Sequence, residues 1–382
     1  MSGLGGMPEG DDAVLVGRVH DPVSGGPRIV GVHRGSVADL TAQVGTVSQL
    51  LERDDALDVV VSACAASERR LDDLLQSAAG DDSAAPHLLA PIDLQVIKAC
   101  GVTFAGSLVE RLIEEQTRGD SARSDEVRAA LLDSIGREAL TVQPGSPQAQ
   151  RVKSVLVERG MWSQYLEVGI GPDPEVFTKG PVLSAVGSGQ SIGVPKFSAW
   201  SNPEPEMVLV VDSMGTPRGA TLGNDVNLRD VEGRSALLLG VAKDNNGSTA
   251  VGPFVRLFDD GFTIESLRSE VIHLEIHGDD GFELADTSNM AQISRSFEEL
   301  VAAAHGDHHQ YPDGFALFTG TLFTPTQDRG EQGKGFTHRI GDRVGISSPH
   351  LGTLSNVVGR SEEIPRWEFG ISSLMEYLRT AG

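Results

Sequence analysis

A chain of 382 residues is longer than an average single domain, and its 39% hydrophobic residues are enough to bury a sizeable core. The formal net charge of −23 repels nucleic-acid phosphates and anionic lipid head groups, which makes both poor partners. Two cysteines are too few for a disulfide framework or a four-thiolate zinc site. The N-terminal residues lack the apolar core of a signal peptide, and the longest apolar runs are too short to cross a bilayer. We therefore expect a cytoplasmic protein without membrane contact.

The N-terminal part is predicted to form a small β-containing domain. Two short apolar segments, residues 14–19 and 28–32, have strand character and are separated by a Gly25-Gly26-Pro27 turn. Residues 79–86 are small, acidic and polar, which is typical of a linker. We therefore assign residues 1–86 to a small domain with its linker and residues 87–382 to a catalytic domain.

The catalytic part is predicted to begin with helices and to continue as strands. Apolar residues recur at helical spacing in residues 104–117, 124–135 and 148–158. From Tyr165 onward, proline and glycine interrupt short strand patterns, with two further helices expected at 297–305 and 372–380. The predicted fold class is therefore α+β, rich in strands and decorated by helices.

Two histidine-containing segments have the composition of metal sites but are better explained in other ways. In residues 271–277, two histidines and a glutamate alternate with isoleucine and leucine, which predicts a half-buried strand with its polar face in water. The three histidines between residues 305 and 309 match no helix-borne zinc spacing, so a polar loop is favoured there. His309 is kept as a candidate pocket residue.

The strongest chemical signal is a pair of carboxylates at the start of an apolar strand. Glu204 and Glu206 are two residues apart and project to the same side of an extended backbone, while residues 207–211 anchor that strand in the core. An exposed acidic edge strand is the alternative for this pair alone. Asp225 follows about one hairpin later, and three carboxylates with water suit Mg²⁺ or Mn²⁺.

A lysine follows the next apolar segment, residues 236–241. Lys243, if it lies near a metal and is partly desolvated, has a lowered pKa and suits the role of a general base. An ordinary exposed loop lysine is the alternative, and the spacing leaves both open.

The order of these elements resembles the fumarylacetoacetate hydrolase superfamily from about residue 88 to the C-terminus. The matching segments are Phe177-Thr178-Lys179, Glu204-x-Glu206, Asn224-Asp225-Val226-x-x-Arg229-Asp230, Ala242-Lys243 and Thr319-Gly320-Thr321. The resemblance implies a mixed β-sandwich or roll as the catalytic domain, and a homodimer or homotetramer. It also implies that Glu204, Glu206 and Asp225 hold the cation and that Lys243 is the catalytic lysine.

One segment bears on the type of reaction. Hydrolytic members of the family are similar to Gly-x-Asn-Tyr-x-x-His-x-x-Glu, whereas this chain has Gly-x-Thr-Phe-x-x-Ser-x-x-Glu over residues 101–110. Glu110 is kept, but Ser107 stands where the histidine would be. A serine without a base of its own accepts no proton near neutral pH, so the resemblance favours enolate chemistry over C–C hydrolysis.

Longer segments are similar to 2-keto-3-deoxy-D-xylonate (2-dehydro-3-deoxy-D-arabinonate) dehydratases, namely residues 89–95, 162–167, 177–181, 223–230, 242–246 and 309–315. This resemblance implies a hydro-lyase that uses Mg²⁺ or Mn²⁺ to form 2,5-dioxopentanoate in non-phosphorylated pentose breakdown. We expect Lys243 as the base and Glu110 as the acid, with substrate contacts from Thr321, Ser107, Lys179 and His309. The alternatives are a hydrolase of a 2,4-diketo acid and a non-catalytic metal- or ligand-binding module.

Overall fold

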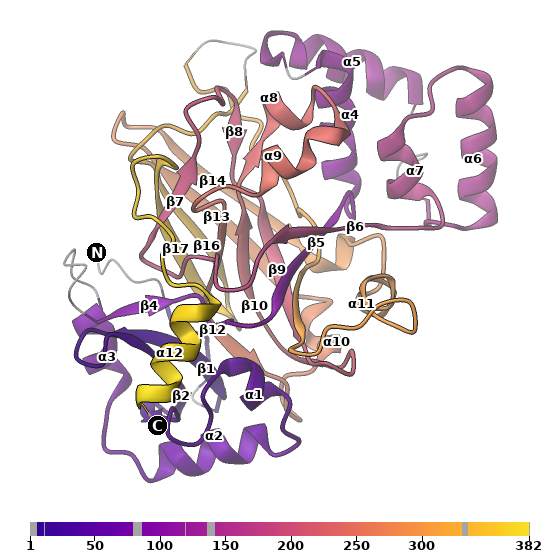
Figure 1. Ribbon diagram of the computed structural model, residues 1–382. Helices are drawn as coiled ribbons and strands as arrows, with labels where there is room; N and C mark the ends of the chain where they lie inside the picture. The colour runs from indigo at the N-terminus through magenta and orange to yellow at the C-terminus, as the bar shows by residue number, and fades with distance from the viewer. Residues whose placement is uncertain are drawn as a thin grey trace.

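The computed structural model describes residues 6–10, 12–78, 86–118, 120–135, 142–330 and 335–381. The linker predicted at residues 79–86 falls, except for residue 86, outside this part of the chain. Two mixed sheets form the centre of the molecule, and helices gather at two ends of them (Figure 1). The predicted strand-rich α+β class is confirmed.

The larger sheet joins strands from both ends of the sequence. Its described strands are β1 Leu15–Asp21, β2 Gly26–His33, β3 Ser36–Asp39, β4 His87–Leu89, β5 Val96–Gly101, β6 Glu175–Gly180, β9 Pro205–Val211, β10 Pro217–Asp225, β12 Thr249–Leu257 and β15 Phe315–Phe318. They follow the order β3-β2-β1-β12-β10-β9-β15-β5-β6, with β4 also paired to β1. Because β1 pairs with β12, the N-terminal strands extend the sheet of the catalytic strands. The domain boundary at residue 86 stays a prediction.

The second sheet packs against one face of the first. Its order is β14-β13-β16-β17-β7, with β7 Ser191–Val194, β13 Val271–His277, β14 Glu283–Asn289, β16 Arg343–Ser348 and β17 Gly352–Arg360. A separate short pair joins β8 Ser201–Asn202 to β11 Asn227–Leu228. In β13 the isoleucines and leucine are buried, and His277 and Glu275 are exposed, so the half-buried strand predicted there is confirmed.

Strand β9 is buried along its whole length because both of its faces meet a core. Met207 and Leu209 lie in the core shared with the second sheet, whereas Val208 and Val210 lie in the core under the N-terminal helices. A strand buried on both faces is a continuous apolar run rather than an alternating one. This double burial fixes the register of β9 and therefore of the two glutamates at its beginning.

The helices occupy the periphery. They are α1 Val47–Leu51, α2 Ala56–Ala65, α3 Leu71–Ala78, α4 Ala105–Thr117, α5 Ser124–Ile135, α6 Pro147–Glu158, α7 Gln164–Ile170, α8 Arg229–Glu232, α9 Leu239–Lys243, α10 Ile264–Leu267, α11 Phe297–Ala304 and α12 Ile371–Ala381. The helices predicted at 104–117, 124–135, 148–158, 297–305 and 372–380 are confirmed within one residue at each end. Helices α1 to α3 were not predicted, because β-branched valines such as those of α2 are typical of strands.

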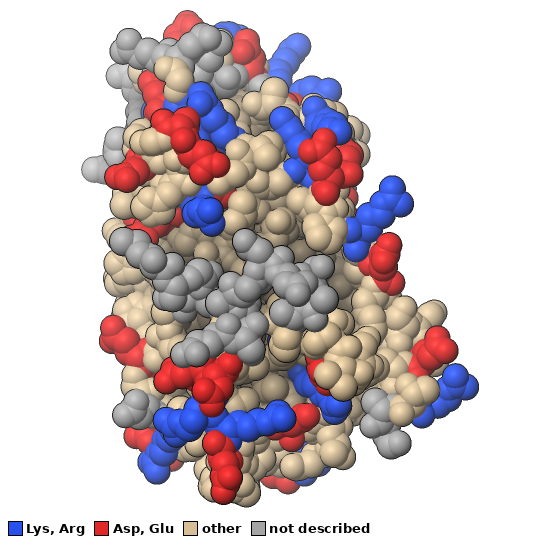
Figure 2. Space-filling model, turned by 90° about the vertical axis from the view of Figure 1, so that its left-hand side faces the viewer, with Lys and Arg blue, Asp and Glu red and all other residues tan. Residues whose placement is uncertain are grey.

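Helix α12 returns the chain to the N-terminal strands (Figure 1). Its Tyr377 ring packs on Gly26, where a Cβ would lie 2.4 Å from the ring. The stretch between β17 and α12 crosses the surface without regular secondary structure. No helix in the described ranges is both long and apolar enough to span a membrane. On the face in Figure 2, acidic and basic side chains are intermingled, and the described residues form no continuous basic field there.

A buried ionic cluster fastens the segment after β15 to the second sheet. Arg329 donates to Asp342 at 2.7 Å, and its guanidinium lies 4.6 Å from the centre of the Phe282 ring. The backbone N–H of Arg339 also donates to Asp342, at 2.8 Å. Burial raises the pKa of Asp342, but hydrogen bonds from His338 and Arg329 outweigh it and lower the pKa to about 2.

Replacing Asp342 should change the dependence of stability on pH. The folded-state pKa of about 2 lies below the unfolded value of about 3.9, so the stabilisation is complete above about pH 4 and is lost as pH falls towards 2. We expect Asp342→Asn to lower the free energy of unfolding by roughly 2–3 kcal/mol at pH 7. Urea unfolding at pH 7 and near pH 3 measures it, and an equal loss at both values would contradict this explanation.

Candidate active site

The three predicted ligand carboxylates converge in space. Strands β9 and β10 are antiparallel, with Glu206 opposite Gly223 and Pro205 opposite Asn224, so the beginning of β9 lies beside the end of β10. The backbone N–H of Glu204 donates to the Asn224 side chain at 3.1 Å, and that of Asp225 to the Glu204 carbonyl at 3.0 Å. One oxygen each of Glu204, Glu206 and Asp225 lies within 4.8 Å of the others, and all three residues are buried.

The segment after β15 holds Glu206. Its carboxylate accepts from the Gly320 backbone N–H at 2.7 Å and from the Thr321 hydroxyl at 3.2 Å. Gly320 has φ +105°, and a Cβ there would lie 1.9 Å from the Thr103 hydroxyl, so only glycine fits. Burial, followed by the charges of Asp225 and Glu204, raises the pKa of Glu206 well above its usual value.

Lys243 ends helix α9 with its ammonium among carboxylates. The Nζ atom lies 2.6 Å from Glu204, 3.1 Å from Asp225 and 3.9 Å from Glu232. Burial lowers the pKa of this lysine, but the three carboxylates outweigh burial, so the pKa is raised above its usual value. The lowered pKa that we expect for Lys243 applies to a lysine beside a bound cation, so it stays a prediction; the raised pKa is that of the site without a cation.

Lys179 lies behind the cluster and is fully buried. Its ammonium is 3.0 Å from Asp225, donates to the Ser248 carbonyl at 3.1 Å and also donates to the Lys243 carbonyl. These three partners use its N–H groups, so the geometry favours support of Asp225 and of the Lys243 backbone. The substrate contact that we expected for Lys179 has no support in this arrangement.

Helix α4 presents a polar face to the cluster. Ser107, Glu110, Arg111 and Glu114 are at positions i, i+3, i+4 and i+7, which share one side of a helix, and all are buried. Arg111 donates to Glu204 at 2.6 Å and to Glu114 at 2.7 Å. Its Nη1 also lies 2.9 Å from Glu232. Our sequence reasoning missed Arg111, although the polar spacing in an otherwise apolar helix was a usable signal.

Glu110 is engaged by two arginines. Its carboxylate accepts from Arg128 and, at 2.9 Å, from Arg229. Burial raises the pKa of Glu110, but these hydrogen bonds and charges outweigh it and lower the pKa. A lowered pKa and two cationic partners keep Glu110 ionised, so it holds no proton to donate as an acid. Glu110 also does not line the narrow cavity that lies beside Glu204, Glu206 and Asp225.

A narrow cavity opens beside the cluster, lined by Cys100, Gly101, Val102, Ser107, Arg111, Glu175, Phe177, Glu204, Glu206, Asp225, Glu232, Lys243 and Thr321. The predicted Ser107 and Thr321 therefore lie at the site. His309 does not line this cavity; it is exposed and packs edge-on against Tyr311 with ring centres 4.6 Å apart. A surface loop places it there, so its expected substrate contact lacks support.

Two carboxylates of the cavity wall were missed in the sequence. The Glu175 carboxylate makes no hydrogen bond or ion pair with any residue in the described ranges, and burial raises its pKa. Burial also raises the pKa of Glu232, to about 7. Glu175 begins β6 and alternates with Phe177 and Lys179, so the period of two that marks one side of a strand was the available signal.

Comparisons with known proteins place this geometry in a family. The model described as "Fumarylacetoacetate (FAA) hydrolase C-terminal" matches residues 160–359. A Haloferax volcanii protein named "Probable 2-keto-3-deoxyxylonate dehydratase" is 31% identical over 268 residues, covering 70% of this chain and 86% of that protein. A Saccharolobus solfataricus protein named "2-dehydro-3-deoxy-D-arabinonate dehydratase" is 32% identical over 191 residues, covering 50% and 60%.

Solved structures share the fold. "2-keto-3-deoxy-D-arabinonate dehydratase complexed with magnesium and 2,5-dioxopentanoate" has a TM-score of 0.62 at 22% identity, covering 91% of this chain and 99% of that chain. A fumarylacetoacetate hydrolase from Exiguobacterium antarcticum has a TM-score of 0.57 at 16% identity, covering 91% and 100%. With the family model matched over more than half of the sequence, the chain belongs to the fumarylacetoacetate hydrolase family.

Proposed function

We propose that this enzyme is a hydro-lyase that removes water from 2-keto-3-deoxy-D-xylonate and yields 2,5-dioxopentanoate. The observation that carries the proposal is the buried trio of Glu204, Glu206 and Asp225 beside the Lys243 ammonium. The names of two sequence relatives support the same reaction class. A structural neighbour that holds magnesium and 2,5-dioxopentanoate supports the product.

The three carboxylates fit a hard divalent cation. They offer oxygen ligands within 4.8 Å of one another, and burial together with their mutual repulsion raises the pKa of Glu206. In our proposal Glu204, Glu206 and Asp225 hold Mg²⁺ or Mn²⁺. When bound, the cation would polarise the 2-keto group and stabilise the negative charge that develops on its oxygen.

Lys243 is our candidate for the base that takes a proton from C3. Two of the carboxylates that raise its pKa, Glu204 and Asp225, are proposed ligands, and a carboxylate that shares its charge with a cation stabilises an ammonium less. Glu232 has a pKa of about 7 and lies 3.9 Å from the Lys243 Nζ, so a water molecule between them would be needed to carry the lysine's proton to Glu232. Arg111 holds both Glu204 and Glu232 in place.

Glu175 replaces Glu110 as our candidate acid. It faces the cavity without an ionic partner in the described ranges, and its raised pKa keeps a proton available. The C3–H and C4–O bonds break, and the hydroxyl leaves as water with the proton from Glu175. A proton shift from C5 to C3 then gives the enol, and transfer of the enol hydroxyl proton to C4 gives the aldehyde. Ser107 and Thr321 line the cavity within reach of a substrate.

The two alternatives have less support. The Ser107 hydroxyl donates to the Phe104 carbonyl at 2.9 Å, and no histidine of the described ranges lines the cavity, so a base for hydrolytic water is not evident. A non-catalytic module does not need a lysine, an arginine and an unpaired glutamate around one cavity. The homodimer or homotetramer and the cytoplasmic location stay predictions.

The reaction itself is tested with 2-keto-3-deoxy-D-xylonate in the presence of Mg²⁺ or of EDTA. We expect release of 2,5-dioxopentanoate with Mg²⁺ and loss of turnover with EDTA, because the carboxylates alone cannot stabilise the developing charge. An aldehyde-trapping assay with mass spectrometry measures both.

Lys243→Met should lower kcat by about 10²–10⁴-fold. Cleavage of an acylpyruvate into pyruvate with no dehydration of the keto-deoxy acid would support the hydrolase instead.

Cation binding is tested by titrating the metal-free protein with Mn²⁺. Glu206→Gln removes one of three anionic ligands and should weaken binding by roughly two orders of magnitude. Asp212→Asn is the matched control, because Asp212 is a buried acid just beyond the other end of β9 that pairs with Arg218. Isothermal titration calorimetry should give unchanged Mn²⁺ affinity for this control. Equal weakening by both variants would point to general destabilisation.

The identity of the acid is tested by comparing Glu175→Gln with Glu110→Gln. We expect Glu175→Gln to lower kcat by about 10²–10⁴-fold with little change in stability, since this side chain has no described partner. Glu110→Gln leaves Arg128 and Arg229 short of a charge, and we expect a loss of about 3–5 kcal/mol in stability. Thermal unfolding and steady-state kinetics separate the two effects. A large loss of kcat confined to Glu110→Gln would restore Glu110 as the acid.

A further inference from the structure

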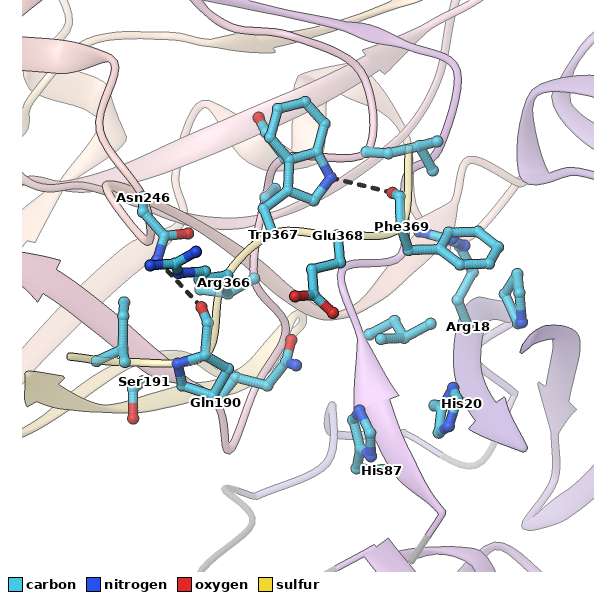
Figure 3. A pocket seen from close by; sticks show the side chains of 18 residues that line it. Arg18, His20, His87, Gln190, Ser191, Asn246, Arg366, Trp367, Glu368 and Phe369 are labelled. Atoms are coloured by element: carbon cyan, nitrogen blue, oxygen red, sulfur yellow. Dashed lines mark hydrogen bonds between the residues drawn. The ribbon is translucent and has the colours of Figure 1, made fainter. Parts of the chain in front are cut away.

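A second cavity, distinct from the acidic one, lies between the N-terminal strands and the stretch that precedes α12 (Figure 3). Its volume is about 430 Å³. Strands β1 and β4 form one wall, the segment 183–191 another, and residues 364–369 cover it. It shares no lining residue with the cavity beside Lys243. A ligand here would therefore be separate from the substrate of the proposed reaction.

The inner wall of this cavity contains a buried arginine. Arg18 is 4% exposed, and its Nη1 donates to the carbonyls of Ala90 at 3.2 Å and Ile92 at 2.7 Å. Its Nε is buried and has no hydrogen-bond partner among the residues that the structure describes. Carbonyl groups carry only partial negative charge, so they compensate a guanidinium incompletely.

The nearest carboxylate is poorly placed to complete the compensation. Asp93 lies 3.9 Å from the Nε of Arg18. It already accepts three backbone N–H groups, from Val47 at 2.6 Å, Ser48 at 3.1 Å and Leu94 at 2.7 Å. Burial accordingly lowers the pKa of Arg18, and the charge of Asp93 offsets this only in part. A buried cation with incomplete compensation, at the wall of an open cavity, is favourable for an anionic group of a ligand.

The remaining lining is suited to hydroxyl groups and sugar-like surfaces. Gln190, Ser191 and Asn246 provide neutral polar groups, and the Glu368 carboxylate projects into the cavity without a partner in the described ranges (Figure 3). The Trp367 ring is 47% exposed at the edge of the cavity. Carboxylate and amide groups accept and donate hydrogen bonds to hydroxyls, and an exposed indole presents a flat apolar surface.

Two histidines, His20 and His87, add ring nitrogens to the polar groups that line the cavity. The rings of His20 and His87 face each other with centres 4.9 Å apart, on adjacent strands β1 and β4. Arg366 adds a second guanidinium from the covering segment. The cavity thus combines donors for an anion on the side of the N-terminal strands with hydroxyl-binding groups on the other sides.

The cavity adjoins the loop that follows Lys243 at the end of α9. The Asn246 side chain donates to the carbonyls of Ser361 at 3.1 Å and Pro365 at 3.0 Å, which ties this loop to the covering segment. The neighbouring Gly247 carbonyl accepts from the Gly193 backbone N–H at 2.9 Å. A ligand in the cavity would therefore contact the loop three residues beyond the proposed catalytic lysine.

We infer that this cavity is a second ligand site, which binds a small organic anion with several hydroxyl groups, its acidic group on Arg18 and its hydroxyls on Glu368, Gln190 and Asn246. A sugar acid and a sugar phosphate share this chemistry. Nothing in the inference depends on the proposed dehydration, because the two cavities are separate.

The test is binding of D-gluconate and D-ribose 5-phosphate to the full-length protein in EDTA, which removes any cation from the acidic cluster. We expect one of the two to bind saturably with one site per chain. Binding of D-gluconate would identify a carboxylate as the acidic group, and binding of D-ribose 5-phosphate would identify a phosphate. Binding should be observed by calorimetry and as a change in Trp367 fluorescence, and Trp367→Phe should remove the optical signal. Neutral D-galactose should not bind, because it offers nothing to Arg18.

Arg18→Met should weaken binding by about tenfold or more, since a charge-assisted hydrogen bond is lost. Arg256→Met is the matched control, because Arg256 is also a buried arginine that donates to a carbonyl and has an unpartnered Nε, but it does not line the cavity. It should keep the wild-type affinity. Glu368→Gln, on the exposed covering segment, tests the hydroxyl contacts without disturbing the fold. Absence of saturable binding of both anions, or equal affinity of wild type and Arg18→Met, would overturn the inference.

Discussion

The structure around the candidate active site depends on compensation of buried negative charge. Within the described ranges, the carboxylates at the site are Glu110, Glu114, Glu175, Glu204, Glu206, Asp225 and Glu232. The basic side chains that face them are Arg111, Arg128, Lys179, Arg229 and Lys243. Seven acids against five bases leave an excess of carboxyl groups, and the raised pKa values of Glu175, Glu206 and Glu232 favour protonation of part of this excess when no cation is bound. Bringing such charges out of water is costly unless each is paired, so the fold around them has to be rigid.

That rigidity comes from elements far apart in the sequence. The doubly buried β9 fixes Glu204 and Glu206, and its pairing with β10 brings Asp225 beside them. Helix α4 adds Arg111, whose guanidinium joins Glu204 to Glu232. Glutamate carboxyl groups at different positions of the site therefore have different pKa values. Glu110, between two arginines, has a lowered pKa, whereas Glu175, partly buried and without a described ionic partner, has a raised one.

Sequence reasoning found what depends on local spacing. The Glu204–Glu206 pair follows from the period of a strand, and the helices of the catalytic part follow from the period of apolar residues. It did not find Glu232 or Arg111, because their roles depend on which helix faces which strand across long sequence separations. It also did not find the number of carboxylates around the Lys243 ammonium, because that number is a property of the tertiary structure.

The two cavities differ in the sign of the buried charge that their surroundings leave incompletely compensated. In the acidic cavity the excess is negative, and a cation completes it; at Arg18 the positive charge is only partly compensated, because Asp93 lies 3.9 Å away and already accepts three backbone N–H groups. The backbone N–H groups that donate to Asp93 belong to the beginning of α1 and to the residue after Asp93. The carboxylate therefore stabilises the local backbone, and less of its hydrogen-bonding capacity remains for Arg18. The Arg18 guanidinium lies at the wall of an open cavity, and the Asp93 carboxylate compensates its charge only in part. A ligand or water in the cavity is the remaining source of hydrogen-bond acceptors for it. That constraint, rather than the size of the cavity, makes the second site specific for an anion.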